Sequence, residues 1–214
     1  MAFTDEQKGI YINNALKAST VHNNEDTGAF KGTFNLANNP QQYEIQRSNN
    51  FEFYVEGLSK TLPSIPNNTA AWDNADDVIR ISVSKAFIPH FTQSAIEVKR
   101  GNNTMKFAGA PSFSSGQIEL NDYIGAGTKD VLLAWQRQSY DINTEKVGLA
   151  SDYKKDAYLL EYTPDYQLIR TWKLQGCWIS ALSEGEFSHD SADKHTISCT
   201  IEYDRAFIDT TDIE

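Results

Sequence analysis

A strict alternation of apolar and polar residues near the C terminus most constrains the fold of this chain. Ile197, Cys199, Ile201 and Tyr203 occupy every second position of the segment 196–203, and the other positions hold Thr, Ser, Thr and Glu. Successive side chains of a β-strand point to opposite faces of the sheet. This period therefore predicts a strand with one buried and one polar face.

Two further strands are predicted just upstream. The segment 157–162 is apolar or aromatic at nearly every position, which predicts a strand covered on both faces. In the next strand, Trp172, Leu174 and Trp178 fall on a common face, and Gly176 marks a position where a bulge is tolerated. The C-terminal third thus predicts a three-stranded sheet.

The middle of the chain continues the β pattern. Alternation predicts strands at Phe51–Val55, at 79–83, where Ile79, Ile81 and Val83 share a face, and at 118–120; it also predicts a hairpin over 96–107 that turns at Gly101-Asn102-Asn103 and is broken at 109–111. The segment 58–77, with Pro63, Pro66 and Trp72, is interpreted as a long loop.

One segment has the period of a helix. Thr128 is the predicted N-cap and Asp130 lies in the first turn. Val131, Leu132, Trp135 and Ile142 then recur at helical spacing. On a β-protein such an apolar stripe covers an open end or an outer face of the barrel.

The N-terminal part differs in composition. Apart from a short predicted helix at 5–17, residues 1–49 are rich in Asn, Thr, Gln and Gly, which predicts an irregular arm. Residues 50–210 are predicted to form the folded domain. The arm is interpreted either as a contact with a neighbouring subunit or as a simple surface segment.

The charge of the chain limits its partners. A formal net charge of −10 argues against a protein that grips nucleic acid, because Lys and Arg supply affinity for phosphates. It is compatible with a channel that DNA passes, since a wall of the same sign repels the backbone. Solubility alone also explains the acidity.

The residues that carry chemistry give no catalytic pattern. The sequence has no Gly-x-Ser-x-Gly motif of hydrolases, no phosphate-binding loop and no three-glycine dinucleotide-binding turn. The spacing of His189, Asp190 and His195 matches no familiar metal site. The four Trp residues are interpreted as core rather than as a sugar site. We therefore expect no enzymatic activity, cofactor or metal.

Cys177 and Cys199 are expected to be reduced, buried thiols. No apolar run is long enough to span a membrane.

The order of several motifs resembles a known family. The motifs are Tyr153-Lys154-Lys155-Asp156-Ala157, Trp172-x-Leu174-x-Gly176-Cys177-Trp178 and a last strand ending in Tyr203-Asp204, preceded by Asn103–Ile118 and a helix with Leu133-Ala134-Trp135-Gln136. In this order they resemble the tail tube proteins of contractile-tailed bacteriophages over residues 50–207. Related tubes occur in contractile injection systems and type VI secretion. The resemblance implies a mainly β fold, a two-sheet β-barrel or sandwich with one flanking α-helix.

The same resemblance implies a structural function. It implies homohexameric rings stacked into a hollow tube in the virion tail, assembled in the host cytoplasm, through which double-stranded DNA passes without specific binding. The implied partners are further copies of the chain and the tail sheath, tape-measure and baseplate or terminator proteins, with no membrane. Alternatives are a tube-initiating or tube-terminating ring, an injection-system tube, or a carbohydrate- or cell-surface-binding β-sandwich.

Two sets of residues are candidates for this function. Glu52, Glu56, Glu119 and Glu202 each oppose an apolar strand face, so they are hypothesised to line the lumen. The candidate subunit interface combines the long loop with the first strand: Pro63, Pro66, Trp72 and Phe51.

Overall fold

The computed structural model describes residues 45–62, 74–190 and 192–209, and Ser48–Glu214 forms one compact unit. The predicted helix at 5–17 and all but the last five residues of the predicted arm lie outside the described residues. Pro63, Pro66 and Trp72 lie outside them as well.

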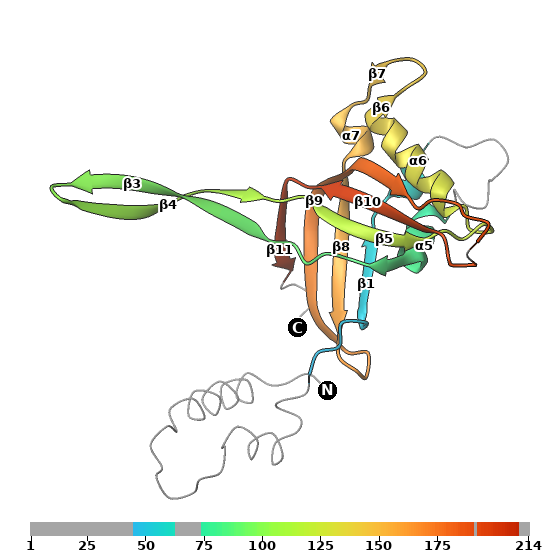
Figure 1. The fold of residues 1–214 in the computed structure, drawn as a ribbon, viewed down its shortest axis with the longest axis horizontal. Coiled ribbons are helices and arrows are strands. Elements are labelled where there is room, and N and C mark those ends of the chain that lie inside the picture. The colour runs from blue at the N-terminus through green and yellow to red at the C-terminus, as the bar shows by residue number, and fades with distance from the viewer. Residues whose placement is uncertain (1–44, 63–73, 191, 210–214) are drawn as a thin grey trace, which may run out of the picture. The chain divides into compact units, whose positions relative to one another are not determined.

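The elements of the compact unit are mostly strands (Figure 1). The strands are β1 (Phe51–Val55), β2 (Val83–Lys85), β3 (Phe91–Arg100), β4 (Asn103–Phe113), β5 (Gly116–Asn121), β6 (Tyr140–Asp141), β7 (Lys146–Val147), β8 (Lys155–Tyr162), β9 (Leu168–Glu184), β10 (Thr196–Glu202) and β11 (Arg205–Asp209). The helices are α3 (Leu58–Thr61), α5 (Ala75–Ser82), α6 (Thr128–Ser139) and α7 (Ala150–Tyr153).

The main sheet is antiparallel and curls into a nearly closed barrel. Its strand order is β1-β8-β9-β10-β5-β2, and β11 also pairs with β9. The first part of β9 pairs with β8 and β11, whereas its second part pairs with β10. We call β1, β8, the first part of β9 and β11 the four-strand sheet. The predicted mainly β barrel with a flanking helix is confirmed.

A bulge at Gly176 allows β9 to serve both halves of the barrel. Gly176 has φ +70°, a left-handed conformation that favours glycine, and the pairing of β8 with β9 shifts register opposite it. The predicted bulge is confirmed. The extra residue reverses the alternation, so Cys177 and Ile179 are buried and Trp178 points outward. The prediction that Trp178 shares a face with Leu174 is therefore wrong.

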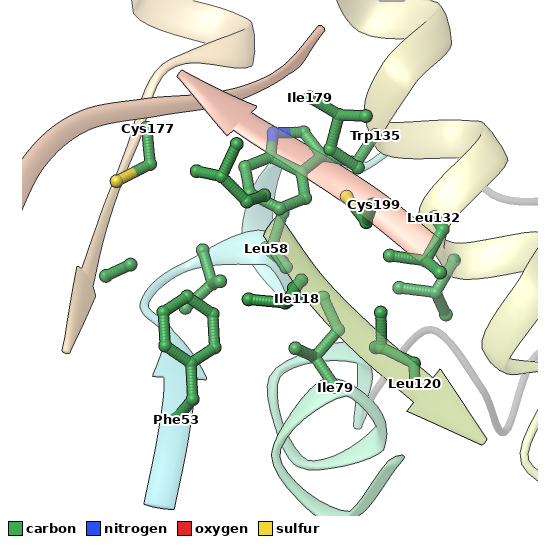
Figure 2. Packing of buried hydrophobic residues seen from close by; sticks show 14 of the residues in the cluster. Phe53, Leu58, Ile79, Ile118, Leu120, Leu132, Trp135, Cys177, Ile179 and Cys199 are labelled. Carbon is green, nitrogen blue, oxygen red and sulfur yellow. The ribbon is translucent and has the colours of Figure 1, made fainter. Parts of the chain in front are cut away.

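The core lies between the curled sheet and the helices α3, α5 and α6 (Figure 2). Phe53, Ile118, Ile179 and Ile201 enter it from the strands, and all are almost completely buried. Trp135 enters from α6, and its indole Nε1 donates to the carbonyl of Tyr153 at 2.8 Å. This bond satisfies the polar end of a buried aromatic ring.

The segment 75–82 is a helix, so the prediction of a strand at 79–83 is wrong. Val78, Ile79 and Ser82 are buried at helical spacing, whereas Ile81 is 71% exposed. Four apolar residues within 78–83 fit both a period of two and a period of 3.6, and Asp76 and Asp77 in the first turn favour the helix. The predicted loop 58–77 is also partly wrong, because α3 occupies 58–61 and α5 begins at 75.

The predicted helix at 128 is confirmed with two changes. Gly127, at φ +65°, is the N-cap, and Thr128 is the first helical residue. The Thr128 hydroxyl instead shares a 2.8 Å hydrogen bond with Ser82 Oγ in the core, which ties α6 to α5. Ile142 lies beyond the helix and is 76% exposed.

Strand β8 is buried on one face rather than two. Lys155, Ala157, Leu159 and Glu161 are buried, and the residues between them are half-buried. The inward carboxylate of Glu161 accepts hydrogen bonds from Trp172 Nε1 at 2.8 Å and from Arg170 Nη1 at 3.3 Å. Partners of this kind make the burial of a charged group tolerable.

Other sequence-based expectations can be compared directly. The hairpin with a turn at 101–103 is confirmed. At the predicted break, β4 continues through Pro111, but its pairing with β3 shifts register between Ala108 and Pro111. Cys177 and Cys199 are buried and free, as expected. None of the described helices combines the length and the apolar run that crossing a bilayer requires.

Candidate functional site

The outward face of the four-strand sheet carries a row of interacting side chains. Tyr54, Tyr158, Lys173 and Phe207 are cross-strand neighbours on β1, β8, β9 and β11. The rings of Tyr54 and Tyr158 stack with centroids 5.0 Å apart, and Lys173 Nζ lies 5.2 Å from the Tyr158 centroid. Such pairs fix the register of neighbouring strands and stiffen the face.

Glu52 belongs to a polar network at one end of this sheet. Its carboxylate forms an ion pair with Arg80 of α5 and accepts a hydrogen bond from the Tyr162 hydroxyl at 2.9 Å. The bond from Arg80 lowers the pKa of Glu52 below its ordinary value. Burial, followed by the bond to Glu52, raises the pKa of Tyr162 to about 12. Glu52 is therefore a charge already neutralised within the subunit.

The other three candidate lumen residues have different surroundings. Glu56, just after β1, accepts a 3.2 Å hydrogen bond from the Tyr158 hydroxyl. Glu119 on β5 forms an ion pair with Lys85 at 2.8 Å. Glu202 on β10 lies opposite Trp178 in the second part of β9, on the outward side of the barrel. Glu52 and Glu56 thus belong to β1 and its end in the four-strand sheet, whereas Glu119 and Glu202 belong to β5 and β10. Their place in a lumen stays a prediction.

One candidate interface residue lies within the described part of the chain. Phe51 begins β1, is half-buried and packs against the core. Within the described residues, β1 has a strand partner on one side, β8, and β11 has one on one side, β9. β1 and β11 are thus the edge strands of the four-strand sheet. An edge strand is a template for pairing with another chain.

The sequence reasoning missed the exposure of the β3–β4 hairpin. Every residue of β3 is exposed, and the hairpin extends away from the barrel (Figure 1). Ile96, Val98, Met105 and Phe107 are among the exposed large apolar side chains. The alternation of these residues with charged ones was the available signal, but alternation alone does not say whether the apolar face is covered.

His195, noted in the sequence with His189 and Asp190, makes its contacts within the described part of the subunit. His195 Nδ1 lies 3.2 Å from Asp122 Oδ2, and Nε2 lies 3.3 Å from the carbonyl of Gly185. The Phe187 ring stacks on the imidazole with centroids 4.5 Å apart. Among residues 45–62, 74–190 and 192–209, no group of three His, Cys, Asp or Glu side chains is arranged to hold a metal ion.

The two thiols are chemically passive. Burial raises the pKa of Cys177 and of Cys199 to about 12. The thiolate is the reactive form of cysteine, so both side chains stay protonated at neutral pH.

Comparison with known proteins shows what the chain is similar to. No family model matches the chain. A tail tube protein of Serratia phage KSP90 is 24% identical over 148 residues, which cover 68% of this chain and 83% of that protein. The chain is a tail tube protein homologue.

Solved structures share the fold of this tail tube homologue. The sheath/tube terminator of an extracellular contractile injection system, PVC, is 19% identical with a TM-score of 0.55, covering 78% of this chain and 98% of that chain. A chain of the anti-feeding prophage baseplate is 10% identical with a TM-score of 0.54, covering 77% and 95%. A chain of the PVC sheath-tube complex is 18% identical with a TM-score of 0.51, covering 78% of this chain and 93% of that chain. These similarities show a common fold.

Proposed function

We propose that this chain is the structural subunit of a tail tube, in which hexameric rings stack into a hollow conduit for double-stranded DNA. The observation that carries the proposal is its homology to the Serratia phage tail tube protein over 83% of that protein. In this proposal the subunit resides in the tail of the particle. Its partners are other copies and the sheath, tape-measure and baseplate or terminator proteins.

The ends of the four-strand sheet supply a physical route to the ring. An edge strand that stays exposed in a monomer can pair with a strand of another chain. Pairing of β11 from one copy with β1 of the next copy would extend the sheet across the subunit boundary. Such a head-to-tail contact closes into a ring when the rotation between copies closes. Phe51 on β1 then lies at the boundary, as do Pro63, Pro66 and Trp72 in the proposal.

The lumen wall in this proposal is polar and acidic. Glu56 and Glu202 supply its negative charge, because Glu52 and Glu119 are ion-paired with Arg80 and Lys85. A wall of the same sign as DNA repels the phosphate backbone and keeps it mobile. Reconstituted tubes in which the Glu56→Lys and Glu202→Lys changes are combined should retain DNA at low salt, whereas wild-type tubes should not.

Electron microscopy of the purified full chain tests the assembly directly. The expected result is hollow rings with six-fold symmetry that lengthen into tubes as concentration rises, accompanied by faster sedimentation. A chain that remains monomeric at the highest soluble concentration contradicts the proposal and favours the alternative of a monomeric carbohydrate-binding module.

A tube-terminating ring is the second candidate. It is supported by the match to the PVC sheath/tube terminator, with a TM-score of 0.55, and to the anti-feeding prophage tube-terminating cap, with 0.52. In this second candidate function the chain forms single rings that end a tube and do not stack. The length distribution of the particles therefore separates the two candidates.

A further inference from the structure

His195 lies between two hydrogen-bond acceptors at the start of β10. Its ring Nδ1 is 3.2 Å from Oδ2 of Asp122, and its Nε2 is 3.3 Å from the carbonyl oxygen of Gly185. The Phe187 ring stacks on the imidazole, with 4.5 Å between the centroids and 9° between the planes. We call His195, Asp122, Gly185 and Phe187 the histidine clasp.

The two acceptors require an imidazole that donates from both nitrogens. A carboxylate and a backbone carbonyl accept hydrogen bonds and donate none. Neutral imidazole carries one N–H, so at either Asp122 or Gly185 a nitrogen lone pair then faces an oxygen lone pair. The protonated ring carries two N–H groups and can donate to both oxygens. Both hydrogen bonds of the clasp therefore form only when His195 is protonated.

The other features of the clasp act in the same direction. The face of an aromatic ring attracts a cation, so Phe187 interacts more strongly with a charged imidazole than with a neutral one. A hydrogen bond between a cation and a carboxylate is also stronger than one between neutral groups. The side chains of His195 and Asp122 are 16% and 21% exposed, so their contact is partly shielded from solvent screening.

Charged groups approach the clasp from each neighbouring element: Asp122 after β5, Glu184 at the end of β9, Lys129 in α6 and Lys194 just before His195. Glu184 and Lys129 form an ion pair, and Lys194 bonds to the side chain of Asn121. The other described titratable residues between β9 and β10 are solvent-exposed: Glu186, His189, Asp190 and Asp193. Carboxylates and ammonium groups ordinarily keep their charge between about pH 5.5 and 8, whereas an imidazole changes its charge there.

The clasp lies where three strands meet. The amide of Asp122 donates to the carbonyl of His195 at 3.1 Å, and the amide of Gly185 donates to the carbonyl of Thr196 at 3.3 Å. These bonds join the ends of β5 and β9 to the start of β10, which pairs with both strands. Because the imidazole contacts the same two residues, its second hydrogen bond holds the two backbone bonds closed.

We propose that the histidine clasp is a pH-dependent contact, in which proton uptake by His195 tightens the junction of β5, β9 and β10. The second hydrogen bond is present while His195 is protonated and is lost as pH rises through the ordinary range of an imidazole, about 6.5. Above that range the chain that carries Phe187 is held less firmly. This inference goes beyond the proposed function, because it concerns one subunit and requires no second copy.

Hydrogen exchange of the purified full chain tests the contact. The Gly185 amide is followed at about pH 5.5 and about pH 8, and the intrinsic exchange rate at each pH is divided by the measured rate to give a protection factor. Protection should be roughly tenfold higher at the lower pH, which is the effect of one charge-assisted hydrogen bond. His195→Gln keeps one donor and one acceptor but takes up no proton, so its protection should not change with pH. Equal protection of the wild-type protein at the two pH values overturns the inference.

Two further variants make the test specific. His189→Gln is the matched control, because it replaces an exposed histidine outside the clasp, and it should keep the wild-type response to pH. Asp122→Asn keeps the shape of the side chain but removes its charge, and should reduce the response to about threefold. A response that disappears in His189→Gln, or that is undiminished in His195→Gln or Asp122→Asn, refutes the clasp. All chains are compared in one assembly state, checked by sedimentation, so failure of the tube proposal leaves this result unaffected.

Discussion

The bulge in β9 predicts that Gly176→Ala destabilises the protein by about 2 kcal/mol. The first cause is the backbone. Gly176 has φ +70°, and an L-residue in this left-handed region costs roughly 1–2 kcal/mol. Because the bulge is the point at which β9 passes from the four-strand sheet to its pairing with β10, the backbone cannot relax without disturbing both.

The second cause is a contact with Asp204. A Cβ added to Gly176 would lie 2.2 Å from Asp204 Oδ2, so that carboxylate must move. Lys154 Nζ then loses its bonds to the two Asp204 oxygens, at 2.7 and 2.8 Å. This ion pair is solvent-exposed and contributes no more than about 1 kcal/mol. The two terms together correspond to a melting temperature roughly 4–8 °C lower for a chain of this size.

Two other glycines make matched controls in urea unfolding followed by tryptophan fluorescence. Gly57 has φ +78° with no atom within 4 Å of an added Cβ, so Gly57→Ala measures the backbone term alone. Gly125 has an equally open site and no positive φ, so Gly125→Ala should be nearly neutral. The expected loss of stability is largest at Gly176, smaller at Gly57 and smallest at Gly125. A Gly176→Ala protein as stable as Gly125→Ala would refute the reasoning.

Three further predictions concern ionisable groups whose pKa values are shifted by burial. Burial lowers the pKa of Lys155, so between the lowered pKa and about 10.4 the unfolded chain binds more protons than the folded chain, and the free energy of unfolding rises with pH. Lys155→Met should therefore be more stable than wild type at pH 7 in chemical unfolding. The difference in free energy of unfolding between the two proteins should shrink as pH rises through that window. Cys177 and Cys199, with pKa values raised to about 12, should resist a thiol reagent at pH 8 in the folded protein and react fully in urea, and rapid native labelling would contradict their burial. Tyr162, raised to about 12, should ionise late in an ultraviolet titration, and Glu52→Gln should bring its pKa down; an unchanged titration would rule out the bond between them.

The regular parts of the barrel were predictable from local pattern. The alternation at 51–55, 118–120 and 197–203 matches β1, β5 and β10 because these strands bury one face, and a half-buried strand imprints its period on the sequence. Gly176 within a strand pattern predicted the bulge, since few other residues adopt its left-handed backbone conformation. The amphipathic stripe of α6 was readable for the same reason as the strands.

The failures have equally local causes. The apolar residues of 78–83 are too few to separate a period of two from a period of 3.6, and packing against the core selected the helix α5. One inserted residue at the bulge reverses the facing of every residue after it, so Trp178 lies on the opposite face from Leu174 although the uninterrupted period places them together.

The sequence by itself determined the amphipathic strands, the α6 stripe, the acidity and the motif order that marks a tail tube homologue, because each depends on neighbours along the chain. Only the tertiary structure decided which glutamates are already ion-paired, where the four-strand sheet ends, and that the large apolar side chains of β3–β4 are exposed. These are relations between residues far apart in sequence. A periodic pattern states that a side chain prefers burial, but only the packed chain shows whether anything buries it.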